Sequence, residues 1–207
     1  AELARAAGRD PLDITLELLG AMAGRDSSGR GGGGFAPDKM IEVLKLAAAK
    51  AGWGEKLPRG RGRGFAITHT NNAYVAVVAA VAVSREGELR IEKLTAAVDA
   101  GQLVNLSSAE SQVQGAMIDG IGAAWFLKMT IAKGAAAVAN FDDYPLLRME
   151  NAPAAVEVHF IKSDAPPTGL GEPGLPPAAP AVCNAIFAAT GKRIRTLPIA
   201  DADLKWS

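Results

Sequence analysis

Apolar positions recur at helical spacing in four parts of the chain. Three leucines lie on one face of residues 11–19, directly after Asp10, a residue type that favours a helix N-cap. The same spacing returns over residues 37–51 and 107–127. A further helix is predicted from Pro180, which suits a first helical turn, to a stop at Gly191.

Strand-type patterns lie between these helices. Residues 65–83 are rich in valine and alanine, and residues 89–98 alternate between polar and apolar positions. A turn over residues 85–88 joins them into a predicted antiparallel hairpin, and residues 155–161 predict another strand. Because helices and strands alternate irregularly, we expect an α+β fold and not a doubly wound parallel sheet.

Two segments rich in turn-forming residues divide the chain. Residues 24–34, with serines and consecutive glycines, predict a flexible linker inside a helical segment over residues 1–52. The main region then covers residues 58–207. Within it, residues 163–177 form a predicted stiff loop with five prolines and three glycines.

Composition excludes several function classes. Lys+Arg and Asp+Glu both number 22, so the net charge is zero, which argues against a nucleic-acid partner. The longest apolar run, residues 73–83, is too short to span a membrane. The single Cys183 excludes an internal disulfide or a multi-cysteine metal cluster, and His69 and His159 lack the spacing of zinc ligands.

The segment Gly169–Gly174 carries the most informative candidate chemistry. Glu172 stands between glycines, which let a backbone approach a ligand closely, and Pro173 fixes the chain after it. A helix begins shortly afterwards, and its positive end favours an ionised carboxylate. Glu172 is therefore a candidate general base; the alternative is a solvated carboxylate in a surface turn.

The helix over residues 107–127 is a second candidate. Ser107 and Glu110 match a capping box at its start. Three glycines in one helix are costly, so either another helix packs there or a cofactor lies against it, with Gln112 or Gln114 forming hydrogen bonds. These glycines are Gly115, Gly120 and Gly122.

Three weaker signals remain, and the first two keep two interpretations each. The run Arg59–Gly64 is either a basic turn that touches a phosphate or a solvated turn. Residues His69–Asn72 either line a pocket or form an ordinary loop. Cys183 lies in an alanine-rich helical run, where we expect a small buried apolar side chain.

Several motifs in one order resemble a known family. The C-terminal ones cover residues 140–149, 169–177 and 184–195, and the upstream ones cover residues 2–11, 61–64, 98–101 and 112–115. Together they resemble the C-terminal part of the molybdopterin-binding large subunit in the xanthine dehydrogenase and aldehyde oxidase superfamily. The resemblance is strongest to the isoquinoline 1-oxidoreductase large subunit and related aldehyde dehydrogenases.

The resemblance implies roles for particular residues. The glutamate of the Gly-x-Gly-Glu-Pro loop is the family's catalytic base and corresponds to Glu172, while Gln112 corresponds to a pterin contact and Gly171 to a neighbouring cofactor-binding position. The implied reaction oxidises an aldehyde or N-heterocycle with water as the oxygen source, on a molybdenum–molybdopterin cofactor in its cytosine dinucleotide form. Gln114 stands where the family commonly has Glu.

The resemblance also implies partners. The glycine-rich phenylalanine loop and the Met-Gly-Gln-Gly segment of the family are absent, so the remaining part of the large subunit should accompany this chain. Electrons would leave to [2Fe-2S] clusters on a small subunit and then to a cytochrome c subunit, and the expected location is periplasmic or membrane-associated. The alternatives are a non-catalytic assembly module that retained the fold and a stand-alone binding domain.

Overall fold

A computed structural model describes residues 1–23, 34–140 and 142–207. The helices are α1 (Glu2–Ala6), α2 (Pro11–Met22), α3 (Pro37–Lys50), α4 (Leu106–Trp125) and α5 (Leu175–Thr190), with a short 3-10 helix η1 (Ile199–Asp201). The strands are β1 (Arg61–Thr70), β2 (Ala73–Val83), β3 (Leu89–Asp99), β4 (Ile131–Ala132), β5 (Ala135–Ala136) and β6 (Val156–Phe160). The mixed content confirms the predicted α+β class.

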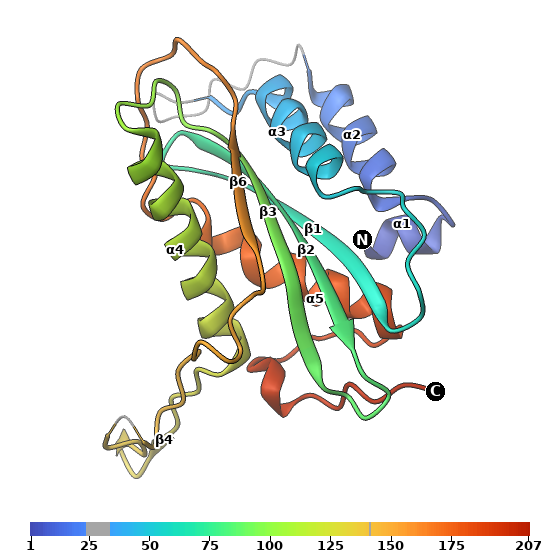
Figure 1. The fold of residues 1–207 in the computed structure, drawn as a ribbon, viewed down its shortest axis with the longest axis vertical. Helices are drawn as coiled ribbons and strands as arrows, with labels where there is room; N and C mark the ends of the chain where they lie inside the picture. The colour runs from blue at the N-terminus through green and yellow to red at the C-terminus, as the bar shows by residue number, and fades with distance from the viewer. Residues whose placement is uncertain (24–33, 141) are drawn as a thin grey trace.

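A four-stranded sheet in the order β1-β2-β3-β6 forms the centre of the fold (Figure 1). The first three strands are antiparallel, so the predicted hairpin between residues 65–83 and 89–98 is confirmed as β2–β3. Strand β6 runs parallel to β3, because the chain between them crosses back through α4. The turn after β3 and the loop after β6 therefore meet at one end of the sheet.

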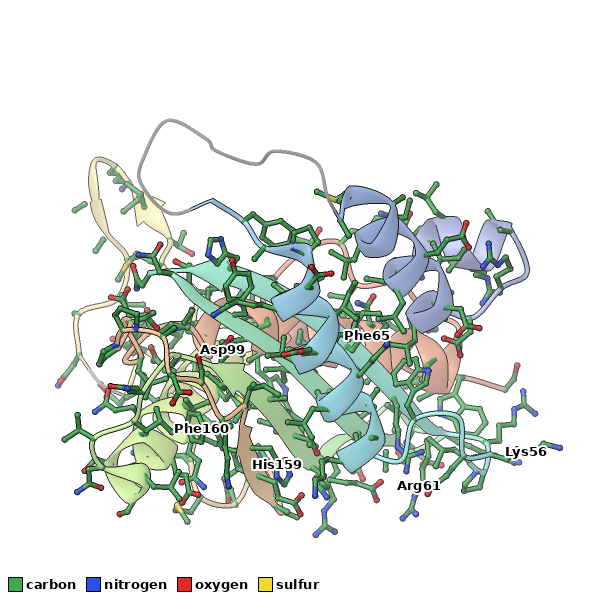
Figure 2. All side chains as sticks on the ribbon, turned by 90° about the horizontal axis from the view of Figure 1, so that it is seen from above. Lys56, Arg61, Phe65, Asp99, His159 and Phe160 are labelled. Carbon is green, nitrogen blue, oxygen red and sulfur yellow. The ribbon has the colours of Figure 1, made fainter. Side chains whose placement is uncertain are left out.

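Helices cover both faces of this sheet, as Figure 2 shows from above with α3 on one side and α5 on the other. On β2, Val75 and Val77 pack into the core shared with α4 and α5, whereas Ala76 and Val78 pack into the core shared with α2 and α3. This central strand is buried on both faces, which explains its uninterrupted apolar sequence. No helix in the described ranges is long and apolar enough to cross a membrane.

The Arg-Gly alternation of residues 59–64 is explained by packing. Gly62 and Gly64 lie on β1 directly against the backbone of α5, where a Cβ atom would collide with main-chain atoms of Ala185. On the opposite face, the Arg63 guanidinium donates to the carbonyl of Gly52 and pairs with Glu55 at 2.8 Å. Both earlier interpretations, a phosphate-binding turn and a solvated turn, are wrong for most of this segment, which is strand from Arg61 onward.

The valine- and alanine-rich stretch over residues 65–83 is interrupted within the polar run His69–Asn72, where a loop was one of the two predictions. It consists of β1 and β2, joined by a tight turn at Asn71 and Asn72. Both asparagines have positive φ, 50° and 60°, a conformation that asparagine tolerates and that suits a two-residue hairpin turn. His69 and Thr70 belong to β1, so only the two asparagines of the predicted polar loop form a turn.

Helix starts were predicted with mixed success. The Asp10 side chain accepts a hydrogen bond from the Leu12 N–H at 2.6 Å, which confirms the predicted cap. The capping box at Ser107 is wrong, because Asn105 is the N-cap of α4 and accepts from the Ser108 N–H at 2.9 Å. Residues 24–33 of the predicted linker lie outside the described residues.

Helix α5 starts at Leu175 and not at Pro180, which lies inside it. Prolines in a first helical turn cost no hydrogen bond, because the N–H groups there have no partner within the helix. Pro176 and Pro177 use this freedom, and the prediction assigned the same position to the wrong proline. The preceding loop is shorter than predicted and ends before Leu175.

Candidate active site on the loop before α5

The loop that leads into α5 is fixed at three points to the neighbouring turns. The Gln102 N–H donates to the Ala165 carbonyl at 2.9 Å and the Thr168 N–H to the Ala100 carbonyl at 3.0 Å, so the loop follows the turn after β3. The Gly169 N–H donates to the Asn71 carbonyl at 3.1 Å, on the β1–β2 turn. These backbone bonds place the loop on a fixed support.

Glycines allow these close approaches. Gly101, with a φ of 69°, lies so near the Pro166 carbonyl that a side chain there would collide with it. A Cβ atom on Gly169 would lie 2.7 Å from the Asn71 Cβ. The loop can therefore hold this path only with glycine at both positions.

Glu172 projects from this support with an exposed side chain. Its Oε2 accepts a hydrogen bond of 3.4 Å from the Asn71 side-chain amide. Its own carbonyl accepts from the Leu175 N–H at 2.9 Å, so Glu172 stands just before the first turn of α5. Backbone hydrogen bonds therefore hold the segment that carries this carboxylate, as the sequence predicted, and the first turn of α5 follows directly after it.

The same loop contacts α4 beside Gln112. A Cβ atom on Gly171 would lie 3.2 Å from the Gln112 Oε1, and one on Gly174 would lie 3.0 Å from the Val113 carbonyl. Gln112 is exposed, and within the described residues its side-chain amide makes no hydrogen bond. Glu172, Gly171 and Gln112, predicted from separate parts of the sequence, thus lie around one surface.

The other polar candidate on α4 is structural. The Gln114 amide donates to the Val156 carbonyl of β6 at 3.3 Å. Gly120 lies under the start of α5, where a Cβ would be 2.5 Å from the Leu175 carbonyl, whereas the position of Gly115 is open. Of the two explanations left open for these glycines, helix packing holds for Gly120.

The two histidines and the cysteine do not belong to the surface formed by Glu172, Gly171 and Gln112. His69 stacks on Tyr74 with ring centroids 4.3 Å apart, and burial lowers its pKa. His159 lies on β6 near Glu157, and no group of three candidate metal ligands occurs in the parts of the chain that the structure describes. Cys183 is half-buried and not fully buried as predicted, and desolvation raises the pKa of its thiol.

The side chains of Glu172 and Gln112 are both exposed. Two hollows of about 850 and 880 Å³, one lined by Arg59 and Trp125 and the other by Leu103 and Phe160, include neither residue. Asn71 is the site residue that sequence reasoning left unassigned, although the polar run at residues 69–72 marked its position.

Fold and site together define an α+β domain that presents an amide and a carboxylate on an open surface, as a cofactor-binding domain would. A family model described as a molybdopterin cofactor-binding domain matches residues 39–153. The chain belongs to this family. The match includes Gln112, whereas Gly171 and Glu172 lie beyond its end.

Similar proteins agree with this assignment. The chain is 34% identical to a membrane-bound aldehyde dehydrogenase [pyrroloquinoline-quinone] of Gluconacetobacter polyoxogenes, over 98% of its length and 27% of that protein. It is 32% identical to the isoquinoline 1-oxidoreductase subunit beta of Brevundimonas diminuta, over 97% of its length and 24% of that protein. The chain thus spans about a quarter of the length of these relatives.

Solved structures show the same fold. Quinoline 2-oxidoreductase from Pseudomonas putida 86 matches 61% of this chain and 17% of its own, with a TM-score of 0.57 and 22% identity. Aldehyde oxidoreductase from Desulfovibrio gigas matches 61% of this chain and 14% of its own, with a TM-score of 0.53 and 26% identity. The resemblance inferred from the motifs is therefore confirmed at the level of family and fold.

Proposed function

We propose that this chain is the part of a molybdenum hydroxylase large subunit that carries the catalytic base, Glu172, and a pterin-contacting residue, Gln112. The observation that carries the proposal is the meeting of Glu172, Gly171 and Gln112 on one exposed surface. The family assignment and the relatives named as aldehyde and isoquinoline oxidoreductases support it.

The residues on this surface fit a molybdopterin. The Gln112 amide can both donate and accept hydrogen bonds and has no protein partner in the described residues. Gly171 leaves room beside the Gln112 Oε1 that a Cβ would fill at 3.2 Å. A ligand with several polar edges can therefore reach the amide without displacing a side chain.

Molybdenum–molybdopterin, when bound, would supply an electrophilic centre and take up the electrons released by the substrate. Glu172 would accept the proton from the water-derived nucleophile, because a carboxylate on a fixed backbone is positioned for proton transfer. Gln112 would orient the pterin through its amide, and the glycine backbone would let the cofactor approach Glu172 closely. The open side of the surface requires further walls from the remaining part of the large subunit.

The finer features of the proposal are those that the family resemblance implies. The substrate class is an aldehyde or an N-heterocycle, the cofactor is the cytosine dinucleotide form, and electrons pass to [2Fe-2S] clusters on a small subunit and from there to a cytochrome c subunit. A periplasmic or membrane-associated location is part of the proposal, and one relative is named as membrane-bound. We further propose residues 58–207 as the catalytic region and residues 1–52 as an attached helical segment.

Metal and pterin analysis of the complex that contains this chain tests the proposal. Bound molybdenum and pterin in stoichiometric amounts, with less pterin in a Gln112→Ala variant, are expected. Gln102→Ala, an exposed glutamine on the turn after β3, is the matched control and should retain its pterin. A complex without molybdenum and pterin would instead support the non-catalytic assembly module.

A further inference from the structure

The β1–β2 turn next to Glu172 has a conformation that only a few residue types adopt readily. Asn71 and Asn72 have φ values of 50° and 60°. Glycine, asparagine and aspartate tolerate this left-handed region, whereas most other residues are strained there. Both positions thus accept the same substitutions, which makes them a matched pair for experiments.

Asn71 is joined to the Glu172 loop by its backbone and by its side chain. Its carbonyl accepts from the Gly169 N–H at 3.1 Å, and Gly169 packs so closely that a Cβ there would be 2.7 Å from the Asn71 Cβ. These contacts place its side-chain amide 3.4 Å from the Glu172 Oε2, although the two residues are 101 positions apart in the sequence. Asn72 makes no hydrogen bond with Glu172.

We propose that Asn71 is a positioning residue for Glu172: its side-chain amide holds Oε2 and leaves Oε1 as the atom that accepts the proton. Within the described residues, Oε1 of Glu172 has no hydrogen-bond or ion-pair partner. A donor on one oxygen restricts rotation of the carboxylate. The catalytic part of this inference rests on the proposed role of Glu172, whereas the effect on the carboxylate does not.

In the described residues the polar contact of the Glu172 carboxylate is the Asn71 amide, and not a titratable group on a neighbouring element. Titratable groups do lie on these neighbouring elements. None of them forms an ion pair or hydrogen bond with Glu172 in the described part of the chain. They are His69 on β1, Tyr74 on β2, Asp99 on β3, Glu110 and Asp119 on α4, and Cys183 on α5. Asp99 is instead paired with Lys39, and His69 stacks on Tyr74.

Carbon-13 NMR relaxation of the Glu172 side chain in the 207-residue chain tests the inference, with the signal assigned from a Glu172→Gln variant. Asn71→Gly keeps the turn conformation and removes the amide, so the order parameter of the Glu172 side chain should fall. Asn72→Gly makes the same change one residue away and should leave the order parameter in place. Equal order parameters in the two glycine variants would overturn the proposal.

Asn71→Asp provides a second test if the glycine variant folds poorly, because aspartate also tolerates the left-handed conformation. It replaces the donor by a negative charge that repels the carboxylate, so the order parameter of the Glu172 side chain should fall at least as far as in Asn71→Gly. An order parameter unchanged in Asn71→Asp would contradict the contact.

A measurement on the loaded enzyme extends the test to catalysis. In Asn71→Gly the kcat should fall severalfold with little change in KM, while Asn72→Gly retains both values. The NMR measurement needs no cofactor, so its outcome does not depend on the proposed enzymatic activity. A lowered order parameter together with a fully active Glu172→Gln enzyme would leave the contact intact and reject only the role of Glu172 in catalysis.

Discussion

The side-chain oxygen of Gln112 lies beside the position that a Cβ atom on Gly171 would occupy. A Cβ atom at position 171 would be 3.2 Å from the Gln112 Oε1, closer than side chains usually pack. This contact joins the exposed face of α4 to the loop that carries Glu172. The absence of a side chain at Gly171 therefore sets the space available to any ligand that reaches the Gln112 amide.

Gly171→Ala should weaken cofactor binding with little change in stability. The added methyl group pushes the flexible end of Gln112 aside, and because the residue is exposed we expect the free energy of unfolding to change by less than about 0.5 kcal/mol. Pterin content should fall at least severalfold, measured against Gly20→Ala, whose position is open. Unchanged pterin content in Gly171→Ala would contradict the assigned position of the cofactor.

Two glycines of α4 should respond in opposite directions to alanine. Gly120→Ala places a Cβ 2.5 Å from the Leu175 carbonyl, so α5 must shift and the protein should lose about 1–3 kcal/mol of stability. Gly115→Ala enters open space in the same helix and should gain about 0.5–1 kcal/mol from helix propensity. Urea unfolding of both variants gives the comparison, and a stable Gly120→Ala would show that the two helices do not pack as described.

Asp99 should be required for the turn that supports the site. It is only 4% exposed, pairs with the Lys39 ammonium at 2.9 Å and accepts from the Gly101 N–H at 3.1 Å. Asp99→Ala leaves the Lys39 ammonium and the Gly101 N–H without this partner. The free energy of unfolding should therefore fall by about 2–4 kcal/mol. Glu92→Ala breaks the more exposed ion pair with Arg61 and should lower the free energy of unfolding by less than about 1 kcal/mol. Similar losses in Asp99→Ala and Glu92→Ala would contradict the special role of Asp99.

Stability should depend on pH through His69. Burial lowers the pKa of His69 below its usual value of 6.5, so just below pH 6.5 the unfolded chain binds a proton that the folded chain does not. Stability should therefore fall as the pH drops below 6.5, until the folded imidazole also becomes protonated. Denaturant unfolding between pH 7.5 and about 5 measures the slope. His69→Phe should reduce this slope, whereas His159→Gln should retain the part due to His69. A slope in His69→Phe equal to that of the unmodified protein would contradict the assignment of the pH dependence to His69.

Much of the fold could be predicted from local patterns. The Asp10 cap, the β2–β3 hairpin and the α+β class follow from spacing and turn chemistry. The polar run His69–Asn72 indicated a loop or a pocket, but it did not show that the chain reverses direction at Asn71 and Asn72 between β1 and β2. The start of α5 was misplaced because several nearby prolines suit a first turn equally well.

The candidate site could also be predicted from the sequence only in part. Its carboxylate and amide could be found from motifs, since Glu172 stands between glycines and Gln112 begins a recognisable segment. Their proximity depends on the contact between Gly171 and α4, and the Asn71 contact depends on packing between the β1–β2 turn and Gly169. Neither long-range contact leaves a periodic signal in the sequence, so only the structure could bring these residues together.

The central claim is that Glu172 is the base of a molybdenum-dependent oxidation, and the turnover of a Glu172→Gln variant in the metal-loaded complex tests it most directly. Glutamine preserves size but cannot take up the proton, so turnover should fall at least about 100-fold while the molybdenum content stays unchanged. Glu150→Gln, which alters an exposed carboxylate away from the site, should retain full turnover. A Glu172→Gln complex with normal molybdenum content and undiminished turnover would contradict the account.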